Sequence, residues 1–159
     1  MDYYFEVLQI IVACLCGLSI GFEREYHGAQ AGIRTYSLVC IGSCLFGIIS
    51  THANGAAYYE SIADPTRIAA QIVSGVGFLG AGIIFKGQSR ISGVTTAANV
   101  WVTASIGLAI AFKMFFLPIF TTVLIIFILS LNRMSFYIRL NKHIKEKNFH
   151  QAIDDESHH

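Results

Sequence analysis

The residues from Ile68 to Phe85 are the feature that most limits how this chain can fold. They are eighteen residues without a formal charge, which is close to the length that a helix needs to cross the hydrocarbon core of a bilayer. Four glycines interrupt the segment, at Gly75, Gly77, Gly80 and Gly82. Small residues let the backbones of neighbouring membrane helices approach closely. The segment therefore predicts a membrane helix that packs closely against other helices.

The composition of the whole chain supports a membrane protein. Of the 159 residues, 54% are hydrophobic and 13% are charged, whereas soluble domains average about 25% charged residues. Not one Asp or Glu lies between Asp64 and Glu146. The formal net charge is +1, so the charge balance gives no reason to expect a nucleic-acid partner. We expect an integral membrane protein with the lipid bilayer as its first partner.

Five apolar segments are long enough to cross a membrane. We predict an all-α fold, a polytopic bundle of five transmembrane helices with the glycine-rich third helix at its centre. Residues 1–132 would form this transmembrane domain, and residues 133–159 a short cytoplasmic tail that is partly an amphipathic helix. The expected spans are residues 3–22, 35–51, 68–85, 92–112 and 114–132.

Two helices carry glycines that we expect to mediate helix packing. Gly17 and Gly21 are four residues apart in the first span, and the other set is the four glycines of the third span. The pattern Gly75-x-Gly77-x-x-Gly80 also matches the dinucleotide fingerprint literally. That motif needs a preceding strand and an acidic residue about twenty positions later, and this chain has no acid there. Helix packing is therefore the better interpretation.

The distribution of Lys and Arg predicts the orientation in the membrane. Alternate sides of the expected bundle hold nine and two of these residues, and the richer side is normally cytoplasmic. We therefore expect the N-terminus outside and the C-terminus in the cytoplasm.

The loop after the first span contains charges on both sides of a glycine-bearing turn. Glu23, Arg24 and Glu25 precede the turn, and Arg34 follows it. One interpretation is a solvated loop whose charges only set the topology. The other is a salt-bridge gate at the membrane edge, in which the carboxylates pair with Arg34.

A second set of polar residues lies at the start of the third span and along the fourth. Asp64, Arg67 and Gln71 share a helix face, and Asn99 lies among threonines in the fourth span. Asp64 followed by Pro is also a good helix start, so a structural cap and a cation-binding role are both open. Asn99 would either bond a neighbouring helix or join a polar path with Gln71.

Catalytic and metal-binding patterns are weak in this sequence. The four cysteines, Cys14, Cys16, Cys40 and Cys44, lie inside apolar segments and read best as small packing residues, with a soft-metal pair of Cys40 and Cys44 as the alternative. His143, Glu146 and His150 in the tail share a helix face, which fits a solvated surface better than a metal site. We expect no enzymatic activity.

Three sequence runs together resemble the membrane domain of the MgtC/SapB family. They are GLSIGFEREYHGAQAGIRTYSLVCIGSCLF, DPTRIAAQIVSGVGFLGAGIIFK and GVTTAANVWVTASIGLAIAF, and the resemblance covers about Gly17 to Phe112. It implies a bacterial inner-membrane protein linked to magnesium limitation and virulence. The matching motif positions are Glu23, Arg24, Glu25, Gly32, Arg34, Thr35, Asp64, Arg67, Gln71, the glycines to Gly82, Thr95, Thr96 and Trp101.

The resemblance and the polar residues lead to two hypotheses of function. In the first, the chain is a regulatory or magnesium-transport-associated membrane protein with a polar site. In the second, it transports nothing and docks on another membrane complex whose activity it modulates. We expect no cofactor, although a bound divalent cation such as magnesium fits the first hypothesis, and homo-oligomers fit either. Compared with longer family members, we expect no soluble C-terminal domain.

Overall fold

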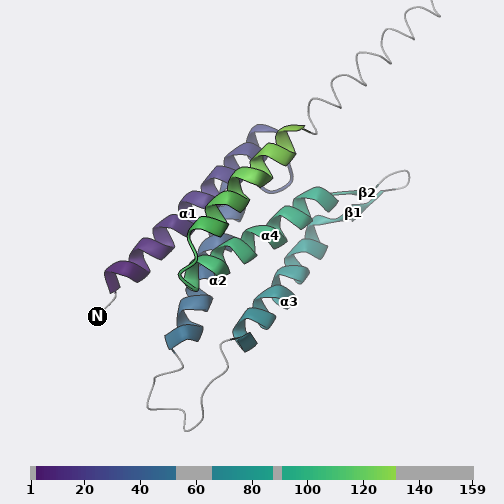
Figure 1. Cartoon of the computed structure of the whole chain (residues 1–159). Helices are drawn as coiled ribbons and strands as arrows, with labels where there is room; N and C mark the ends of the chain where they lie inside the picture. The colour runs from purple at the N-terminus through teal and green to yellow at the C-terminus, as the bar shows by residue number, and fades with distance from the viewer. Residues whose placement is uncertain (1–2, 53–65, 88–90, 132–159) are drawn as a thin grey trace, which may run out of the picture. The chain divides into compact units, whose positions relative to one another are not determined.

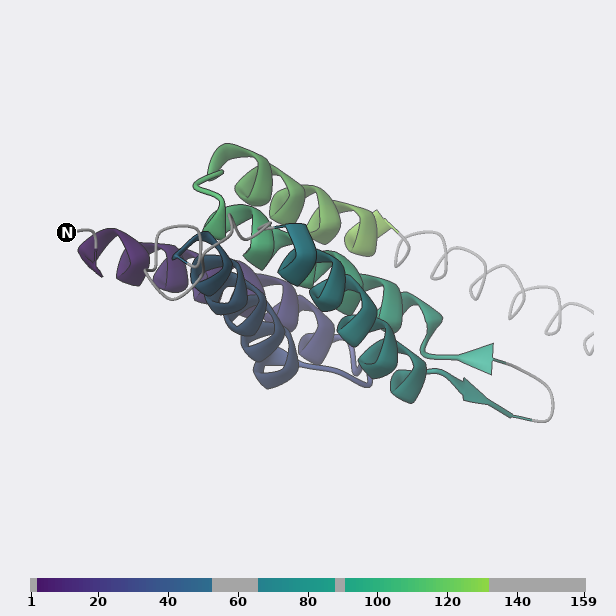
Figure 2. The same cartoon turned by 90° about the horizontal axis from the view of Figure 1, so that it is seen from below.

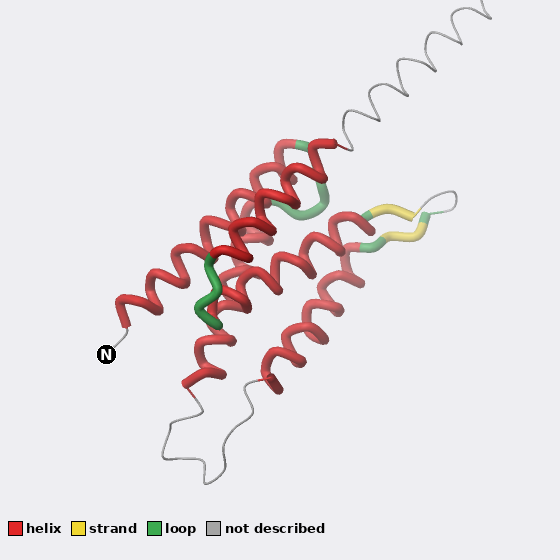
Figure 3. The backbone as a smooth tube through the Cα atoms, in the orientation of Figure 1, coloured by secondary structure: helices red, strands yellow, loops and turns green. Residues whose placement is uncertain are grey.

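The computed structural model describes residues 3–52, 66–87 and 91–131, and it is helical apart from one short hairpin (Figures 1 and 3). The two strands of the hairpin pair antiparallel, with Phe85 opposite Ser92. The expected all-α membrane bundle is therefore confirmed. The elements are α1 (Tyr3–Tyr26), α2 (Ile33–His52), α3 (Thr66–Ile83), β1 (Phe85–Lys86), β2 (Ile91–Ser92) and α4 (Val94–Ala111), followed by the helix Phe116–Leu131.

Four of the described helices, α1 to α4, are long and apolar enough to cross a membrane. The fifth, Phe116–Leu131, is apolar but shorter within the described part of the chain. The chain divides into two units at residues 123 and 124, and the packing described below lies within residues 3–123. The predicted amphipathic helix in the tail, residues 133–159, lies outside the described residues.

Helices α1 and α2 approach each other closely at two glycines of α1. A Cβ atom added to Gly17 would lie 2.7 Å from the Cα of Ser37, and one added to Gly21 would lie 2.6 Å from the Cα of Ile33. Any larger residue at these positions would have to push the two backbones apart. Both glycines belong to the set predicted for packing, and they place the end of α1 directly against the start of α2.

Helices α2 and α4 meet at two further glycines that the sequence analysis did not single out. A Cβ atom added to Gly107 of α4 would strike the backbone carbonyl of Cys40, and one added to Gly47 of α2 would lie 2.5 Å from the Cβ of Ala111. Half of the residues in the membrane-spanning part of α4 are buried. The core of residues 3–123 therefore lies among α1, α2 and α4.

The prediction that the third helix is central is wrong. Only two of the 18 residues of α3, Val76 and Gly80, are buried. Gly80 makes an ordinary contact, 3.6 Å from an added Cβ to the Cβ of Ala97 in α4. Figure 1 shows α3 at one side of the group, beside α4, and in Figure 2, seen from below, α3 lies in front of α4.

The other three glycines of α3 do not line a close contact between the helices that the structure describes. A Cβ atom added to Gly75, Gly77 or Gly82 meets no atom within 4 Å. A glycine-rich segment indicates that another helix backbone can approach it closely, but it does not show which helix does so. The expected packing role at these three positions is therefore not met within the described chain.

The difference between the two kinds of glycine gives a stability prediction. Gly107→Ala should destabilise the folded protein by about 1–3 kcal/mol, the usual range for overpacking, because the added methyl group strikes the backbone of α2. Gly77→Ala should be neutral or slightly stabilising, because alanine is the better helix former. Unfolding of both variants in detergent micelles, followed by circular dichroism, measures the difference. Equal tolerance at the two positions would show that α2 and α4 are not in this contact.

Candidate functional site

Four polar side chains from three helices come together where α1 ends and α2 begins. Glu23 and Arg24 lie in the last turns of α1, Tyr36 in the first turns of α2, and Asn99 in the first half of α4. The side chains of Glu23 and Arg24 are only 11% and 16% exposed, while Tyr36 and Asn99 are 0% and 9% exposed. We call these four residues the polar cluster. Tyr36 lies near enough to each of the other three for electrostatic interaction, and its hydroxyl donates a hydrogen bond of 3.4 Å to the carbonyl oxygen of Thr96 in α4.

Three atoms of the polar cluster are buried without a hydrogen-bond partner. They are Glu23 Oε2, Arg24 Nε and Asn99 Nδ2. Arg24 Nη1 lies 3.8 Å from Glu23 Oε2, which is an ion pair but too long for a hydrogen bond. Leaving a buried polar atom unpaired costs about 1–3 kcal/mol, and more for a charged group. Such atoms in a native structure call for an explanation, and a water molecule, an ion or a ligand at the polar cluster would supply one.

Neighbouring groups fix the orientation of the carboxylates. His27 Nδ1 lies 3.1 Å from Glu23 Oε1 and 2.7 Å from the Glu23 carbonyl oxygen. Glu25 Oε2 accepts a hydrogen bond of 2.8 Å from the backbone N–H of Ile33. That bond satisfies a free N–H at the start of α2, so Glu25 has a capping role there.

The salt-bridge gate predicted with Arg34 does not form. Arg34 is exposed, and none of the ion pairs found among residues 3–52, 66–87 and 91–131 includes it. Position 34 lies one residue into α2, and the carboxylates instead meet Arg24, His27 and the N–H of Ile33. Thr35 is likewise exposed.

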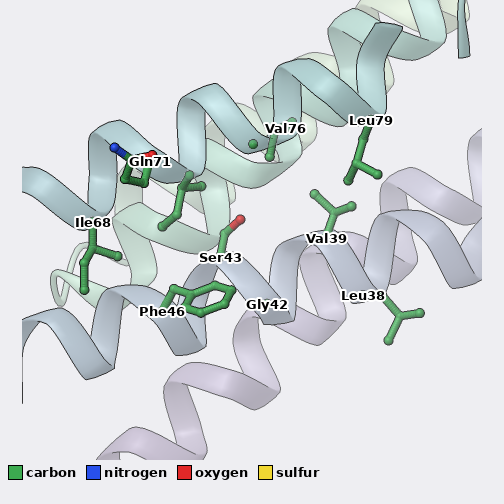
Figure 4. A pocket seen from close by; sticks show the side chains of 11 residues that line it. Leu38, Val39, Gly42, Ser43, Phe46, Ile68, Gln71, Val76 and Leu79 are labelled. Carbon is green, nitrogen blue, oxygen red and sulfur yellow. The ribbon is translucent and has the colours of Figure 1, made fainter. Parts of the chain in front are cut away.

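The predicted residues of the third span lie apart from the polar cluster. Arg67 is exposed, and Asp64 lies outside the described residues. Gln71 lines an apolar groove of about 600 Å³ between α2 and α3, together with Ser43, Phe46 and Val76 (Figure 4). The described structure therefore does not join Gln71 and Asn99 into one polar path.

A separate polar pocket of about 340 Å³ adjoins the polar cluster. Its walls come from the turn after α1, from β2 and from the first turn of α4. Gly93 connects the last two with a φ of 89°, a left-handed conformation that favours glycine. A Cβ atom at Gly93 would also strike the carbonyl of Ile83. We call this the polar pocket; its lining residues are Arg24, His27, Gly28, Ala29, Gln30, Ile91, Gly93, Val94, Thr95 and Thr96.

The opposite end of α1 contains a polar residue that the sequence analysis missed. Gln9 is 2% exposed, and its Nε2 donates to the carbonyl oxygens of Ile110 and Ala111 at 2.5 and 2.9 Å. These are C-terminal carbonyls of α4, where helix carbonyls run out of partners in the next turn, and the Ile110 carbonyl also accepts the N–H of Lys113 at 2.9 Å. The sequence does contain a signal for this role, because Gln9 is an amide side chain in an apolar span. Near it, His52 Nε2 lies 3.0 Å from Glu6 Oε1.

No metal-ligand cluster occurs among the residues that the structure describes. No three His, Cys, Asp or Glu side chains lie together there in a way that could hold a metal ion. The four cysteines are free thiols. The predicted tail residues His143, Glu146 and His150 lie outside the described ranges.

These features define the class of protein, a polytopic helical membrane protein with a buried polar cluster at one end of its core helices. Comparison with known proteins then identifies the family. Residues 10–135 match the MgtC family, and the chain belongs to that family. A search of solved structures found no match.

Several named relatives support this assignment. The chain is 41% identical over 157 residues to an Escherichia coli K12 protein named "Putative magnesium transporter YhiD", covering 96% of this chain and 69% of the relative. It is 40% identical over 115 residues to SapB of Bacillus subtilis, covering 69% and 50%. It is 44% identical over 108 residues to MgtC of Brucella abortus, covering 65% and 43%. The matches to SapB and MgtC therefore span half of those proteins or less.

The unpaired amide of Asn99 gives a test that separates a functional role from a structural one. Asn99→Leu removes an amide whose Nδ2 has no hydrogen-bond acceptor among the described residues, so the free energy of unfolding should fall only by what the interaction of Asn99 with Tyr36 contributes, about 1 kcal/mol. If the polar cluster is a functional site, this variant should be inactive although it folds and inserts normally. A strongly destabilised Asn99→Leu protein would show that the amide is instead a structural hydrogen-bonding group.

Proposed function

We propose that this chain is a bacterial inner-membrane protein that supports magnesium transport, chiefly as a regulator. The polar cluster is its working site, and no catalytic step is involved. The observation that carries the proposal is a set of three buried polar atoms, from α1 and α4, that have no hydrogen-bond partner among the described residues, in a family whose relatives include YhiD, named for magnesium transport. An adaptation to low magnesium, and through it a contribution to virulence, would follow from such a role.

The charges of the polar cluster favour regulation over simple conduction. Mg²⁺ is usually bound by one or two carboxylates and several retained waters, and Glu23 offers one carboxylate. The guanidinium of Arg24, however, lies 3.8 Å from that carboxylate and repels a cation placed there. An ion pair of this length has no hydrogen bond between its partners, so it is weak and separates easily. We therefore propose that the pair of Glu23 and Arg24 rearranges as a switch.

The orientation is part of the same proposal. Arg24 at the end of α1, Arg34 at the start of α2 and Lys86 in the hairpin between α3 and α4 lie at the same end of these helices, and positively charged ends and loops normally face the cytoplasm. The polar cluster then lies at the cytoplasmic edge of the inner membrane, where it can respond to conditions inside the cell.

A second candidate function rests on a different observation. The open glycines of α3, at positions 75, 77 and 82, leave room for a close helix contact that the described chain does not make. Gly77 and its neighbours could accept a helix of another membrane complex, or of a second copy of this chain. In that case the chain acts by docking, and the polar cluster is structural.

Growth under magnesium limitation tests the proposal. The chain is expressed in a bacterial strain whose own family member has been deleted, and growth is measured at limiting and at ample magnesium. Glu23→Gln should abolish the growth advantage at limiting magnesium, while its amount in the membrane stays normal, because the variant removes the charge that pairs with Arg24. Glu6→Gln is the matched control, since Glu6 pairs with His52 at the other end of α1.

The outcomes separate the two candidates. Loss of growth with Glu23→Gln but not with Glu6→Gln supports the polar cluster. Loss with Gly77→Leu while Glu23→Gln grows normally supports docking through α3 and contradicts the proposed site.

A further inference from the structure

The polar pocket is lined by hydrogen-bond donors and by no carboxylate. Its polar side chains come from Arg24, His27, Gln30, Thr95 and Thr96, and each of them can donate a hydrogen bond. Magnesium takes oxygen ligands, and its protein ligands are typically carboxylates. Glu23 lies near Arg24 but is not in the pocket wall. The lining therefore suits an anion and not Mg²⁺.

The first turn of α4 adds backbone donors to the same pocket. The N-cap residue Gly93 offers no side-chain cap, and Ala97 N–H is the group that bonds back to the Gly93 carbonyl, at 2.8 Å. The preceding N–H groups of a helix have no partner within the helix, and here they belong to the lining residues Val94, Thr95 and Thr96. The positive end of the helix dipole also favours an anion at this place.

Two side chains at the pocket, one buried and one largely buried, have a donor with no acceptor among the described residues, and an anion would supply one. Thr96 is 3% exposed and lies in the pocket wall, and no hydrogen bond to its hydroxyl is found among the described residues. By contrast, the hydroxyl of Thr103 in the same helix donates to the Asn99 carbonyl at 2.8 Å. Arg24, also in the pocket wall, has a buried Nε without a partner. Each of these side chains can therefore donate a further hydrogen bond, and a phosphate oxygen would accept it.

We propose that the polar pocket binds a phosphate group, held by the Arg24 guanidinium, the Thr96 hydroxyl and the first-turn N–H groups of α4. Arginine suits this role because its planar fork of donors matches phosphate oxygens. A volume of about 340 Å³ is at the small end of ligand sites, and it has room for a phosphate group together with part of the molecule that carries it. The phosphate belongs either to a soluble phosphate compound or to the headgroup of an anionic phospholipid. This site goes beyond the magnesium role and does not depend on it.

Binding to the purified full chain tests the proposal and separates the two sources. In detergent, inorganic phosphate is titrated into the protein and the heat of binding is recorded. In lipid nanodiscs, the unfolding temperature is compared between pure phosphatidylcholine and a mixture with phosphatidylglycerol. Binding of inorganic phosphate identifies a soluble ligand. Stabilisation by phosphatidylglycerol alone identifies a lipid headgroup.

Two variants with matched controls locate the binding. Arg24→Gln should weaken the affinity at least about tenfold, which corresponds to losing one charge-assisted hydrogen bond. Thr96→Val should weaken it about threefold or more, and this variant keeps the test valid if Arg24→Gln does not fold. Arg34→Gln and Thr103→Val, at an exposed arginine and a satisfied buried hydroxyl, should change it less than about twofold.

Two results would overturn the inference. One is that neither inorganic phosphate nor phosphatidylglycerol affects the native protein. The other is that Arg24→Gln and Thr96→Val bind as the controls do, which would place any phosphate elsewhere. Since none of these measurements contains magnesium, their failure leaves the growth test of the magnesium role unaffected.

Discussion

The close approach of helix backbones at glycines is the contact on which the rest of the structure depends. Gly17 and Gly21 bring α1 against the start of α2, and Gly107 brings α4 against the middle of α2. In a bilayer, helices gain little from hiding apolar surface, so such contacts and interhelical hydrogen bonds hold a bundle together. Because the three backbones lie this close, Glu23 and Arg24 at the end of α1 become largely buried near Tyr36 of α2, which also interacts with Asn99 of α4. The polar cluster is thus a consequence of backbone packing.

This arrangement divides the chain into a tight core and a loosely held helix. α1, α2 and α4 share the close glycine contacts, whereas α3 rests on α4 through Val76 and Gly80 and leaves a groove toward α2. The hairpin of β1 and β2 joins α3 to α4 at the end where the polar pocket lies. A movement of α3 would therefore pull directly on Gly93 and on the donors of the first turn of α4. The proposed site and the open glycines of α3 therefore lie on neighbouring elements.

Much of the fold could be predicted from the sequence, because length and the absence of charge fix the spans. The glycines of α1 were also found, since a four-residue spacing places them on one face. The central position of the third helix was not correct, because a glycine-rich segment does not reveal which helix it meets. For the site, the charges at Glu23 and Arg24 were evident, but their partners were not. Tyr36 and Asn99 come from segments distant in the sequence, and only tertiary packing joins them.

The claim that the polar cluster acts as one unit across helices is tested most directly by a double-mutant cycle between Arg24 and Tyr36. Free energies of unfolding would be measured in detergent for the native chain, Arg24→Gln, Tyr36→Phe and the double variant. Neighbouring groups in one network show coupling of about 0.5–3 kcal/mol, and we expect a value in that range because Tyr36 interacts with Arg24 across the contact between α1 and α2. Strict additivity, within about 0.3 kcal/mol, would contradict the account.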